Sequence, residues 1–277
     1  MAARFPFKTN MKTSEQRRAL KCAVEAAKTV GNLLRKNQFA VKKVDSSTQH
    51  DIKLALDVRS QRVIENRLRH AFPEVAILGE EGISGDPRAP QRWVVDPIDG
   101  TVNFTYGIPH ACVSIALQEK AANGRADYED GYNSLLGVVY DPFCDELWTA
   151  LRGETARLNN RLIQVSKRRK LTEAVVSIGF AKTRQNLEAT LPYFLELVHG
   201  VRKIRIMGSA ALALTYVASG RFDAYIERGI RLWDIAAGGL ILECAGGKFS
   251  HDAIEEDYAY RMISSNKILH PRLRIPE

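Results

Sequence analysis

The chain has 277 residues, of which 45% are hydrophobic and 26% charged, which is the composition of an ordinary soluble globular protein with a sizeable core. No apolar run approaches the ~20 residues needed to span a bilayer, and Met1 to Gln16 contain no apolar signal core. The sequence therefore predicts no membrane-spanning helix and does not indicate export, so we expect a cytoplasmic location.

The formal net charge of +8 is unevenly distributed. Residues 1–70 carry 16 Lys and Arg against 6 Asp and Glu, whereas residues 71–163 carry 7 against 14. A basic surface can attract nucleic acid or an anionic substrate. No nucleic-acid motif and no interleaved aromatic residues accompany the basic part, so the favoured interpretation is a solvated helix face.

The first part of the chain predicts two helices separated by a loop. Apolar residues recur at helical spacing from Ser14 to Lys36, and Thr13-x-x-Gln16 is a capping-box pattern at the start of that helix. The polar segment Val41–His50 predicts a mobile loop. Asp57 predicts the N-cap of a second helix, which runs to about Phe72.

Two predicted strands end in carboxylates. Val75–Leu78 is an apolar run followed by Gly79, Glu80 and Glu81. Arg92–Val95 is rich in β-branched and aromatic residues, which is typical of a strand buried on both faces. Because Pro97 lacks an N–H, we expect this second strand to stop there.

Asp96 and Asp99 lie three residues apart on the turn that follows the second strand. Active sites of α/β sheets tend to lie at such strand ends. Oxygen ligands at a fixed separation suit Mg²⁺, and two carboxylates without a cation would repel each other. Alternatively, Asp-Pro-x-Asp-Gly is only a turn, because Pro, Asp and Gly favour turns for local reasons. The acidic strand end at Glu80 favours the cation site.

The remainder of the chain alternates between strands and helices. The hydrophilic segment Lys120–Ser134 predicts a hairpin insertion, and Lys167–Lys170 predicts an exposed linker between two halves. Asp234, near the start of the last helix, can be explained by itself as an N-cap. The other predicted strands are Ala111–Gln118, Leu136–Tyr140, Leu147–Ala150, Val175–Ile178, Lys203–Met207 and Ala224–Glu227, and the helices are Leu187–Val198, Gly208–Ala218 and Trp233–Ala245.

The cysteines and histidines do not indicate a zinc site. Cys22, Cys112, Cys144 and Cys244 are far apart and form no CxxC pair, so we interpret them as reduced, mainly structural thiols. The histidines form no pair at metal-binding spacing, and His110 is interpreted as a packed residue rather than a ligand.

Several stretches together resemble a known family. GEEG at Gly79–Gly82, WVVDPIDGTVNF at Trp93–Phe104 and WDIAAGGLILECAGG at Trp233–Gly247 are similar to signatures of the inositol monophosphatase family of Mg²⁺-dependent, lithium-sensitive phosphatases. The resemblance implies an α/β (α+β) fold, the layered α-β-α-β-α sandwich of the sugar phosphatase (fructose-1,6-bisphosphatase-like) type. We expect residues 1–166 to form an N-terminal half with the main metal motifs and residues 167–277 to complete the site.

The resemblance also implies a pair of Mg²⁺ ions. Glu80, Asp96 and the backbone carbonyl of Ile98 would hold one ion, and Asp96, Asp99 and Asp234 the other. A third position is left open, because Lys42 and Lys43 are out of register with the family's loop and Ile52 to Leu56 lack its usual threonine.

Catalysis of this type uses metal-activated water in an in-line attack on a phosphate monoester. By resemblance, Glu80 and the Thr101 hydroxyl orient the water, and Asp57 faces the metals through water. Gly100 and Thr101 are expected to open a helix whose N–H groups bind phosphate oxygens. The residues expected to contact the substrate are Asp99, Gly100, Thr101, Gly208, Ser209, Ala210, Glu227 and Asp234.

The expected substrate is a small polyol monophosphate, first of all inositol monophosphate. Histidinol phosphate and sugar or fructose bisphosphates remain alternatives, although Gly137–Ala150 is more similar to the inositol and histidinol branches than to the nucleotide branch. The resemblance implies a homodimer. Some relatives have regulatory roles beside catalysis, so an RNA-associated role of the basic N-terminal surface also stays open, although nucleic acid is the less favoured partner.

Overall fold

The computed structural model describes residues 9–47, 52–122, 126–180, 183–255 and 257–275. Within these residues no helix is both long and apolar enough to cross a membrane. The helices are α1 (Thr13–Asn37), α2 (Ala55–Ala71), α3 (Thr101–Thr105), α4 (Arg184–Gly200), α5 (Ala210–Ala218) and α6 (Leu232–Cys244), with short 3₁₀ turns at Leu171–Glu173 and His270–Arg272.

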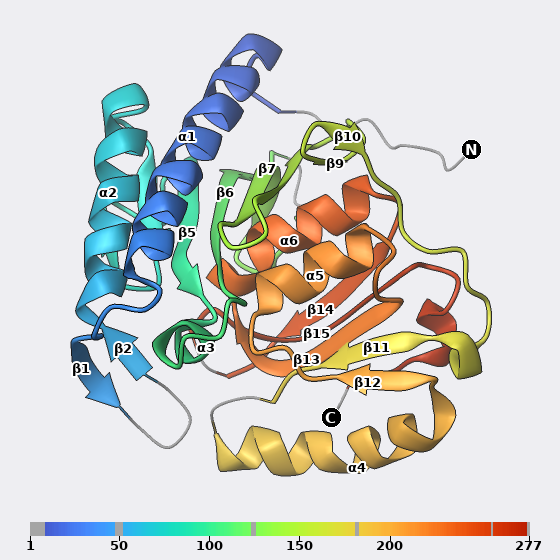
Figure 1. Ribbon diagram of the computed structural model, residues 1–277. Helices are drawn as coiled ribbons and strands as arrows, with labels where there is room; N and C mark the ends of the chain where they lie inside the picture. The colour runs from blue at the N-terminus through green and yellow to red at the C-terminus, as the bar shows by residue number, and fades with distance from the viewer. Residues whose placement is uncertain (1–8, 48–51, 123–125, 181–182, 256, 276–277) are drawn as a thin grey trace.

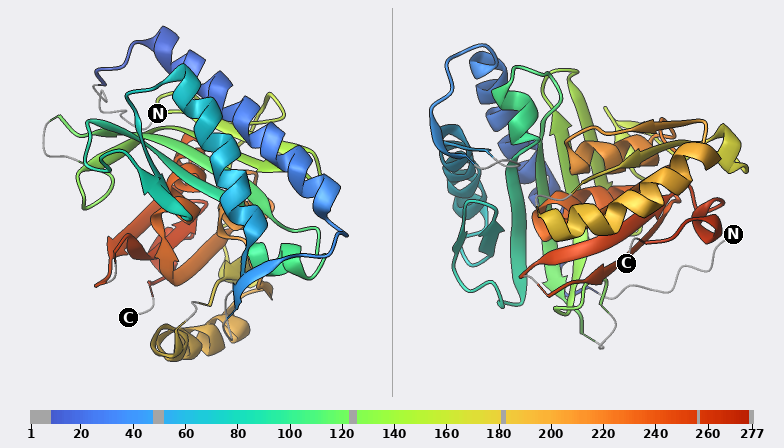
Figure 2. Two further views of the ribbon diagram at one scale, coloured as in Figure 1. Left: turned by 90° about the vertical axis from the view of Figure 1, so that its left-hand side faces the viewer. Right: turned by 90° about the horizontal axis from the view of Figure 1, so that it is seen from below.

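The elements form five alternating layers (Figures 1 and 2). Helices α1 and α2 cover the outer face of a first sheet, α5 and α6 lie between that sheet and a second one, and α4 covers the outer face of the second sheet. This arrangement confirms the predicted α-β-α-β-α sandwich.

The first sheet comes from the N-terminal part of the chain. Strands β3 and β5 are parallel, and the other neighbours are antiparallel. Its strands, as far as the structure describes them, are β3 (Ala76–Gly79), β4 (Gly82–Ser84), β5 (Gln91–Asp99), β6 (Cys112–Lys120), β7 (Tyr132–Asp141), β8 (Glu146–Leu151), β9 (Arg157–Leu158) and β10 (Arg161–Leu162), in the order β10-β9-β8-β7-β6-β5-β3-β4.

The second sheet is built after residue 166. Strand β11 is parallel to both β12 and β13, and β15 is antiparallel to β13 and β14. The described strands are β11 (Val175–Ile178), β12 (Lys203–Arg205), β13 (Ala224–Arg231), β14 (Lys248–Ala253) and β15 (Ala259–Ser265), in the order β12-β11-β13-β15-β14.

Helix α6 is apolar on all sides from Ile235 to Leu242, and this stretch is buried between the two sheets. It lies so close to β7 that a Cβ at Gly137 would be 2.6 Å from the Ala237 carbonyl oxygen. The helix enters the core cluster together with residues of both sheets, among them Val139 and Tyr225. The two halves of the chain therefore share a core; their division into separate domains stays a prediction.

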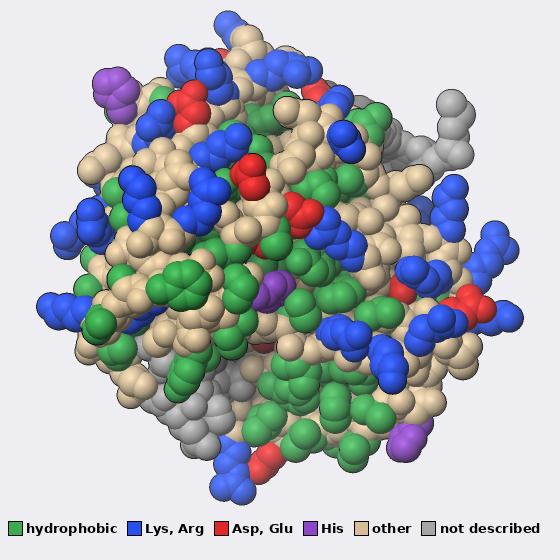
Figure 3. All heavy atoms as spheres, in the orientation of Figure 1, with side chains coloured by type: hydrophobic (Ala, Val, Ile, Leu, Met, Phe, Trp, Pro, Cys, Tyr) green, Lys and Arg blue, Asp and Glu red, His purple; other side chains and the backbone are tan. Residues whose placement is uncertain are grey.

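The outermost helix, α4, is less completely covered. Leu191, Leu195 and Val198 recur along one side of it and are exposed. Figure 3 shows hydrophobic side chains gathered over this part of the molecule. The exposed stripe marks a side of α4 that the described residues do not cover.

The predicted helix starts were partly wrong. Helix α1 has Lys12 as its N-cap, and Glu15 Oε2 accepts a hydrogen bond from Lys12 N (3.1 Å), so Thr13 is not the cap. Helix α2 begins at Ala55, and Asp57 occupies its third position, where Oδ2 accepts a hydrogen bond from Leu54 N (2.7 Å). In both helices an acid in the first turn, rather than an N-cap side chain, satisfies a backbone donor.

The segment predicted as a mobile loop contains strand β1 (Val44–Ser47), which pairs with β2 (Ile52–Leu54). That prediction was wrong for β1, whereas residues 48–50 lie outside the described residues. The expected hairpin insertion joins the antiparallel strands β6 and β7, with residues 123–125 outside the described part.

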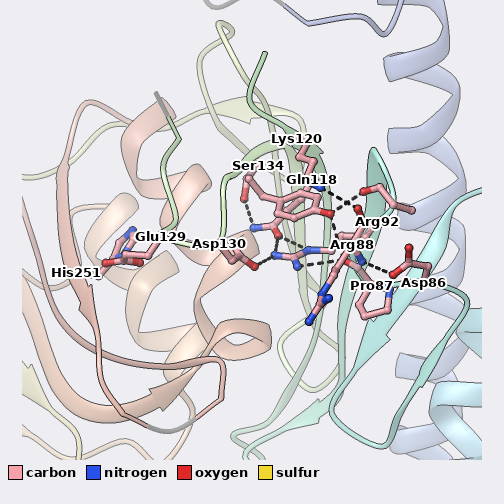
Figure 4. A network of polar contacts seen from close by, with 12 residues as sticks. Asp86, Pro87, Arg88, Arg92, Gln118, Lys120, Glu129, Asp130, Ser134 and His251 are labelled. Carbon is pink, nitrogen blue, oxygen red and sulfur yellow. Dashed lines mark hydrogen bonds and ion pairs between the residues drawn. The ribbon is translucent and has the colours of Figure 1, made fainter. Parts of the chain in front are cut away.

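A buried arginine anchors the insertion (Figure 4). Arg92 is 2% exposed, donates two hydrogen bonds to Gln118 Oε1 and pairs with Asp130. Its guanidinium lies over the Tyr132 ring, 3.7 Å from the centroid. Glu129 points the other way, toward His251 of β14, and its Oε1 accepts a hydrogen bond from Ala253 N (2.9 Å). The insertion thus connects the two sheets.

Candidate metal centre

A cavity of about 540 Å³ opens where the ends of β3, β5, β11 and β13 meet the starts of α3, α5 and α6. The first sheet contributes Glu80, Asp96 and Asp99, and the later part of the chain contributes Glu227 and Asp234. Strand ends and helix starts thus bring residues from both halves into one cavity.

Three carboxylates form the centre of the site. Asp96, Asp99 and Asp234 each offer an oxygen, and these oxygens all lie within 4.8 Å of one another. Burial raises the pKa of Asp96 well above its usual range, and the charges of Glu80, Asp99 and Asp234 raise it further. A cluster of this kind is electrostatically unfavourable unless a cation neutralises it.

Strand β5 delivers Asp96 and Asp99 by continuing through Pro97, where it was expected to stop. The register with β6 shifts between Asp96 and Asp99, so the missing N–H of Pro97 falls at an irregularity. Asp96 Oδ1 accepts a hydrogen bond from Ile98 N (2.9 Å), which satisfies a donor that the ladder leaves over.

Gly100 follows this strand in a conformation that favours glycine. Its φ is +94°, and a Cβ there would be 2.9 Å from the His110 carbonyl oxygen. Helix α3 begins at the next residue, Thr101, whose hydroxyl donates to the Ile98 carbonyl (2.9 Å). The Ile98 carbonyl and the Thr101 hydroxyl are therefore fixed next to each other at the cavity wall.

Asp99 is held by the start of α5. Ser209 Oγ and Ala211 N donate to Asp99 Oδ2 at 2.6 and 2.7 Å, and Ala210 N donates to Oδ1 at 3.2 Å. Burial raises the pKa of Asp99, and these hydrogen bonds lower it again in part because they favour the charged form. Ser209 is the N-cap residue of α5, but its hydroxyl donates to Asp99 rather than to its own helix.

Asp234 reaches the cluster from α6. It is the third residue of that helix rather than its N-cap, which is Arg231, and its Oδ2 accepts a hydrogen bond from Arg231 N (2.9 Å). Ser114 Oγ of β6 donates to the Trp233 carbonyl (3.1 Å), so the helix start is attached to the first sheet.

The other predicted residues are placed as follows. Glu80, Ile98, Gly100, Thr101, Gly208, Ser209, Ala210 and Glu227 all line the cavity. Asp57 is 2% exposed and is not among the described residues of the lining, so its expected contact with the metals stays a prediction.

Sequence analysis missed one wall of the cavity, formed by Ser177–Phe180, Thr183 and Asn186. Residues 177–180 come at the end of the parallel strand β11, so the strand-end argument applied to Glu80 and Asp96 would have indicated them. Asn186 had no comparable signal; its Oδ1 accepts a hydrogen bond from Arg228 Nε (2.9 Å).

The donor set fits Mg²⁺. The converging carboxylates, together with the nearby Ile98 carbonyl, are hard oxygen ligands. Cys112 is the one thiol described beside the cluster, with Sγ 3.6 Å from Asp99 Oδ2, and burial raises its pKa well above the usual range.

Comparisons with known proteins agree with this geometry. The model of the inositol monophosphatase family matches residues 15–272. The Nus factor SuhB of Xylella fastidiosa is 40% identical over 236 residues, which cover 84% of this chain and 81% of that protein. The inositol-1-monophosphatase of Rhizobium meliloti is 42% identical over 203 residues, covering 71% and 70%.

Solved structures are similar over nearly the whole chain. An inositol monophosphatase from Anabaena superposes with a TM-score of 0.79 at 33% identity, covering 93% of this chain and 94% of that one. The extragenic suppressor protein suhB of Bartonella henselae gives a TM-score of 0.81 at 32% identity, covering 92% and 96%. These likenesses confirm the expected sugar phosphatase type of fold.

Proposed function

The chain belongs to the inositol monophosphatase family, a family of phosphoric monoester hydrolases, and we propose that it hydrolyses a small polyol monophosphate, first of all inositol monophosphate. The observation that carries the proposal is that carboxylate oxygens of Asp96, Asp99 and Asp234 lie within 4.8 Å of one another in the lining of a cavity. A module that only binds a partner would have no physical need for three mutually repelling acids, of which Asp96 and Asp99 are buried and Asp234 is partly buried.

We propose Mg²⁺ as the cofactor, with two ions and a third position left open. Glu80, Asp96, the Ile98 carbonyl, Asp99 and Asp234 would hold them. Bound Mg²⁺ would neutralise phosphate charge and lower the pKa of a water molecule. Lithium sensitivity and a homodimer stay predictions from the family.

The residues of the chain would orient the reactants. Thr101 Oγ1, fixed on the Ile98 carbonyl, would accept a hydrogen bond from the attacking water and orient it, and the Glu80 carboxylate would accept the water's proton. Asp99, held in one orientation by α5, and Glu227 would accept hydrogen bonds from hydroxyls of the alcohol. Carboxylate acceptors of this kind suit a polyol better than an alcohol that has no hydroxyl besides the esterified one.

The proposal is tested by phosphate release from inositol monophosphate, histidinol phosphate, fructose 1,6-bisphosphate and a nucleotide 3′-phosphate, with Mg²⁺ and with added Li⁺. We expect inositol monophosphate to have the highest kcat/KM. Asp96→Asn should lower kcat/KM by about 10³-fold, because it removes the carboxylate central to the cluster.

Asp86→Asn is the matched control. Asp86 is exposed, and its Oδ1 accepts a hydrogen bond from Arg88 N. The side-chain oxygen of an asparagine at this position can accept the same hydrogen bond. This variant should keep full activity. Unchanged turnover in Asp96→Asn would contradict the proposed metal site. A preference for histidinol phosphate would change the proposed substrate but leave the proposed reaction in place.

A second candidate is an RNA-associated role. Several relatives at 37–40% identity are called Nus factor SuhB. In this chain Lys167, Arg168, Arg169 and Lys170 are exposed and line an open groove. This groove adds to the basic N-terminal part as a surface for a polyanion.

That candidate predicts binding of a single-stranded RNA at 50 mM salt that weakens steeply by 200 mM, as counterion release requires. A Lys167→Gln, Lys170→Gln double variant should reduce the salt dependence, measured by fluorescence anisotropy. Absence of RNA binding even at low salt would remove the candidate.

A further inference from the structure

The position of the Glu227 carboxylate is determined first by its own strand. Tyr225 precedes it by two residues on β13, so both side chains project from the same face of the sheet. Tyr225 is 2% exposed, and its hydroxyl donates a hydrogen bond to Glu227 Oε2. The Glu227 carboxylate is thus hydrogen-bonded to the Tyr225 side chain, which is buried in the core.

The neighbouring strand provides a second constraint. Parallel strands β11 and β13 pair Ser177 with Tyr225 and Ile178 with Ile226, and Gly179 N donates to the Ile226 carbonyl (2.9 Å). Gly179 therefore lies beside Glu227. A Cβ at Gly179 would overlap the Glu227 carboxylate, with Oε2 as its nearest atom, so the carboxylate occupies space that only a glycine leaves.

We propose that Tyr225 and Gly179 are positioning residues that determine the preference for a polyol, by holding Glu227 where a hydroxyl of the leaving alcohol donates to it. This inference rests on the proposed function. Glu227, Tyr225 and Gly179 all line the same cavity as the three-aspartate cluster. A fixed acceptor favours the alcohol whose hydroxyl reaches it and penalises one that leaves it unpaired.

The direction of the hydrogen bond supports this role. Burial raises the pKa of Tyr225 well above its usual range, and the charge of Glu227 raises it further. The phenol therefore stays protonated and acts as a donor to the carboxylate. The hydrogen bond to Oε2 restricts rotation of the Glu227 carboxylate in the free protein. Substrate binding therefore loses less conformational entropy from this side chain.

The kinetic test compares two substrates, inositol monophosphate and p-nitrophenyl phosphate, which has no alcohol hydroxyl. For Tyr225→Phe we expect KM for inositol monophosphate to rise about tenfold with kcat within about threefold, since one charge-assisted hydrogen bond is lost. The kcat/KM for p-nitrophenyl phosphate should stay unchanged. Gly179→Ala should shift the ratio of the two kcat/KM values in the same direction.

Two controls separate positioning from general damage. Tyr260→Phe removes another buried tyrosine hydroxyl, on β15, and Gly200→Ala adds a methyl group where no atom lies within 4 Å. Both should leave the ratio unchanged. In the Glu227→Gln background, Tyr225→Phe should add less than twofold, because the two residues act through one contact.

A crystal structure of the Tyr225→Phe variant tests the inference without a substrate. We expect the Glu227 carboxylate to rotate away from its place beside Gly179; an unmoved carboxylate overturns the positioning role. If wild-type enzyme hydrolyses p-nitrophenyl phosphate but no polyol monophosphate, the proposed function fails and the selectivity inference fails with it. If it hydrolyses both and Tyr225→Phe keeps the ratio, the inference alone fails.

Discussion

At the scale of single residues, Asp99 shows how hydrogen bonds can favour the charged form of a buried acid. Burial alone would favour its protonated form, but three donors from the start of α5 bond its two oxygens. An ionised acid is what a cation requires. The short, well-packed contact with Ser209 is the part of this arrangement that a substitution can remove without disturbing the backbone.

Ser209→Ala should weaken Mg²⁺ binding about three- to tenfold, because losing a hydrogen bond to the charged form raises the pKa of Asp99 further. The measurement is the melting temperature as a function of Mg²⁺ concentration, since an ion that binds only the folded state raises it by linkage.

Ser264→Ala is the matched control, because Ser264 is also buried but its hydroxyl donates to the Tyr225 carbonyl. It should leave the half-saturating Mg²⁺ concentration unchanged. Equal Mg²⁺ requirements in Ser209→Ala and the wild type would show that the serine does not hold Asp99 for the ion.

At the scale of elements, contact of α6 with β7 brings Asp234 to the cluster. Gly137→Ala places a Cβ 2.6 Å from the Ala237 carbonyl, and neither backbone can yield easily. We expect the free energy of unfolding to fall by about 1–3 kcal/mol, measured by urea denaturation, with weaker Mg²⁺ binding because α6 is displaced.

Gly200→Ala tests whether a methyl group as such is harmful. Gly200 is the last residue of α4 and has open space around its Cα, so alanine should be neutral or stabilise the protein by up to about 1 kcal/mol. A Gly137→Ala variant as stable as Gly200→Ala would contradict the close packing of α6 on β7.

The sequence predicted elements best where periodicity and strand ends carry the information. The long helices and eight of the fifteen described strands were predicted to within four residues, whereas β14 and β15 of the second sheet were not predicted. Glu80, Asp96 and Asp99 were indicated by their places after apolar runs. Helix starts were predicted less well. Asp57 and Asp234 were predicted as N-caps but occupy the third position of their helices. The sequence does not separate the two positions, because an acid at either one satisfies a backbone donor near the helix start.

Contacts between distant segments could not be predicted from residues alone. Nothing near Asp99 in the chain indicates that Ser209 will bond it, and nothing near Pro97 indicates the register shift that lets β5 continue. These features depend on how α5 and β6 pack, which is a property of the assembled layers.

At the scale of the whole molecule, the site joins two parts of the chain that build different sheets. Residues before 167 supply Glu80, Asp96 and Asp99, and later residues supply Ser209, Glu227 and Asp234. The cluster combines carboxylates of β5 with Asp234 of α6, so cations bound there would link the first sheet to the helix layer as well as serve catalysis.

Asp99 and Ser209 are 110 residues apart, which has a consequence during translation. At about 5–20 residues per second, a ribosome needs roughly 5 to 20 seconds to make the intervening stretch. Throughout that time Asp99 at the end of β5 lacks the hydrogen-bond donors at the start of α5, which have not yet been synthesised. A chain released before residue 209 would lack Ser209, Glu227 and Asp234, so we expect it to lack the proposed hydrolytic activity even if its first sheet folds.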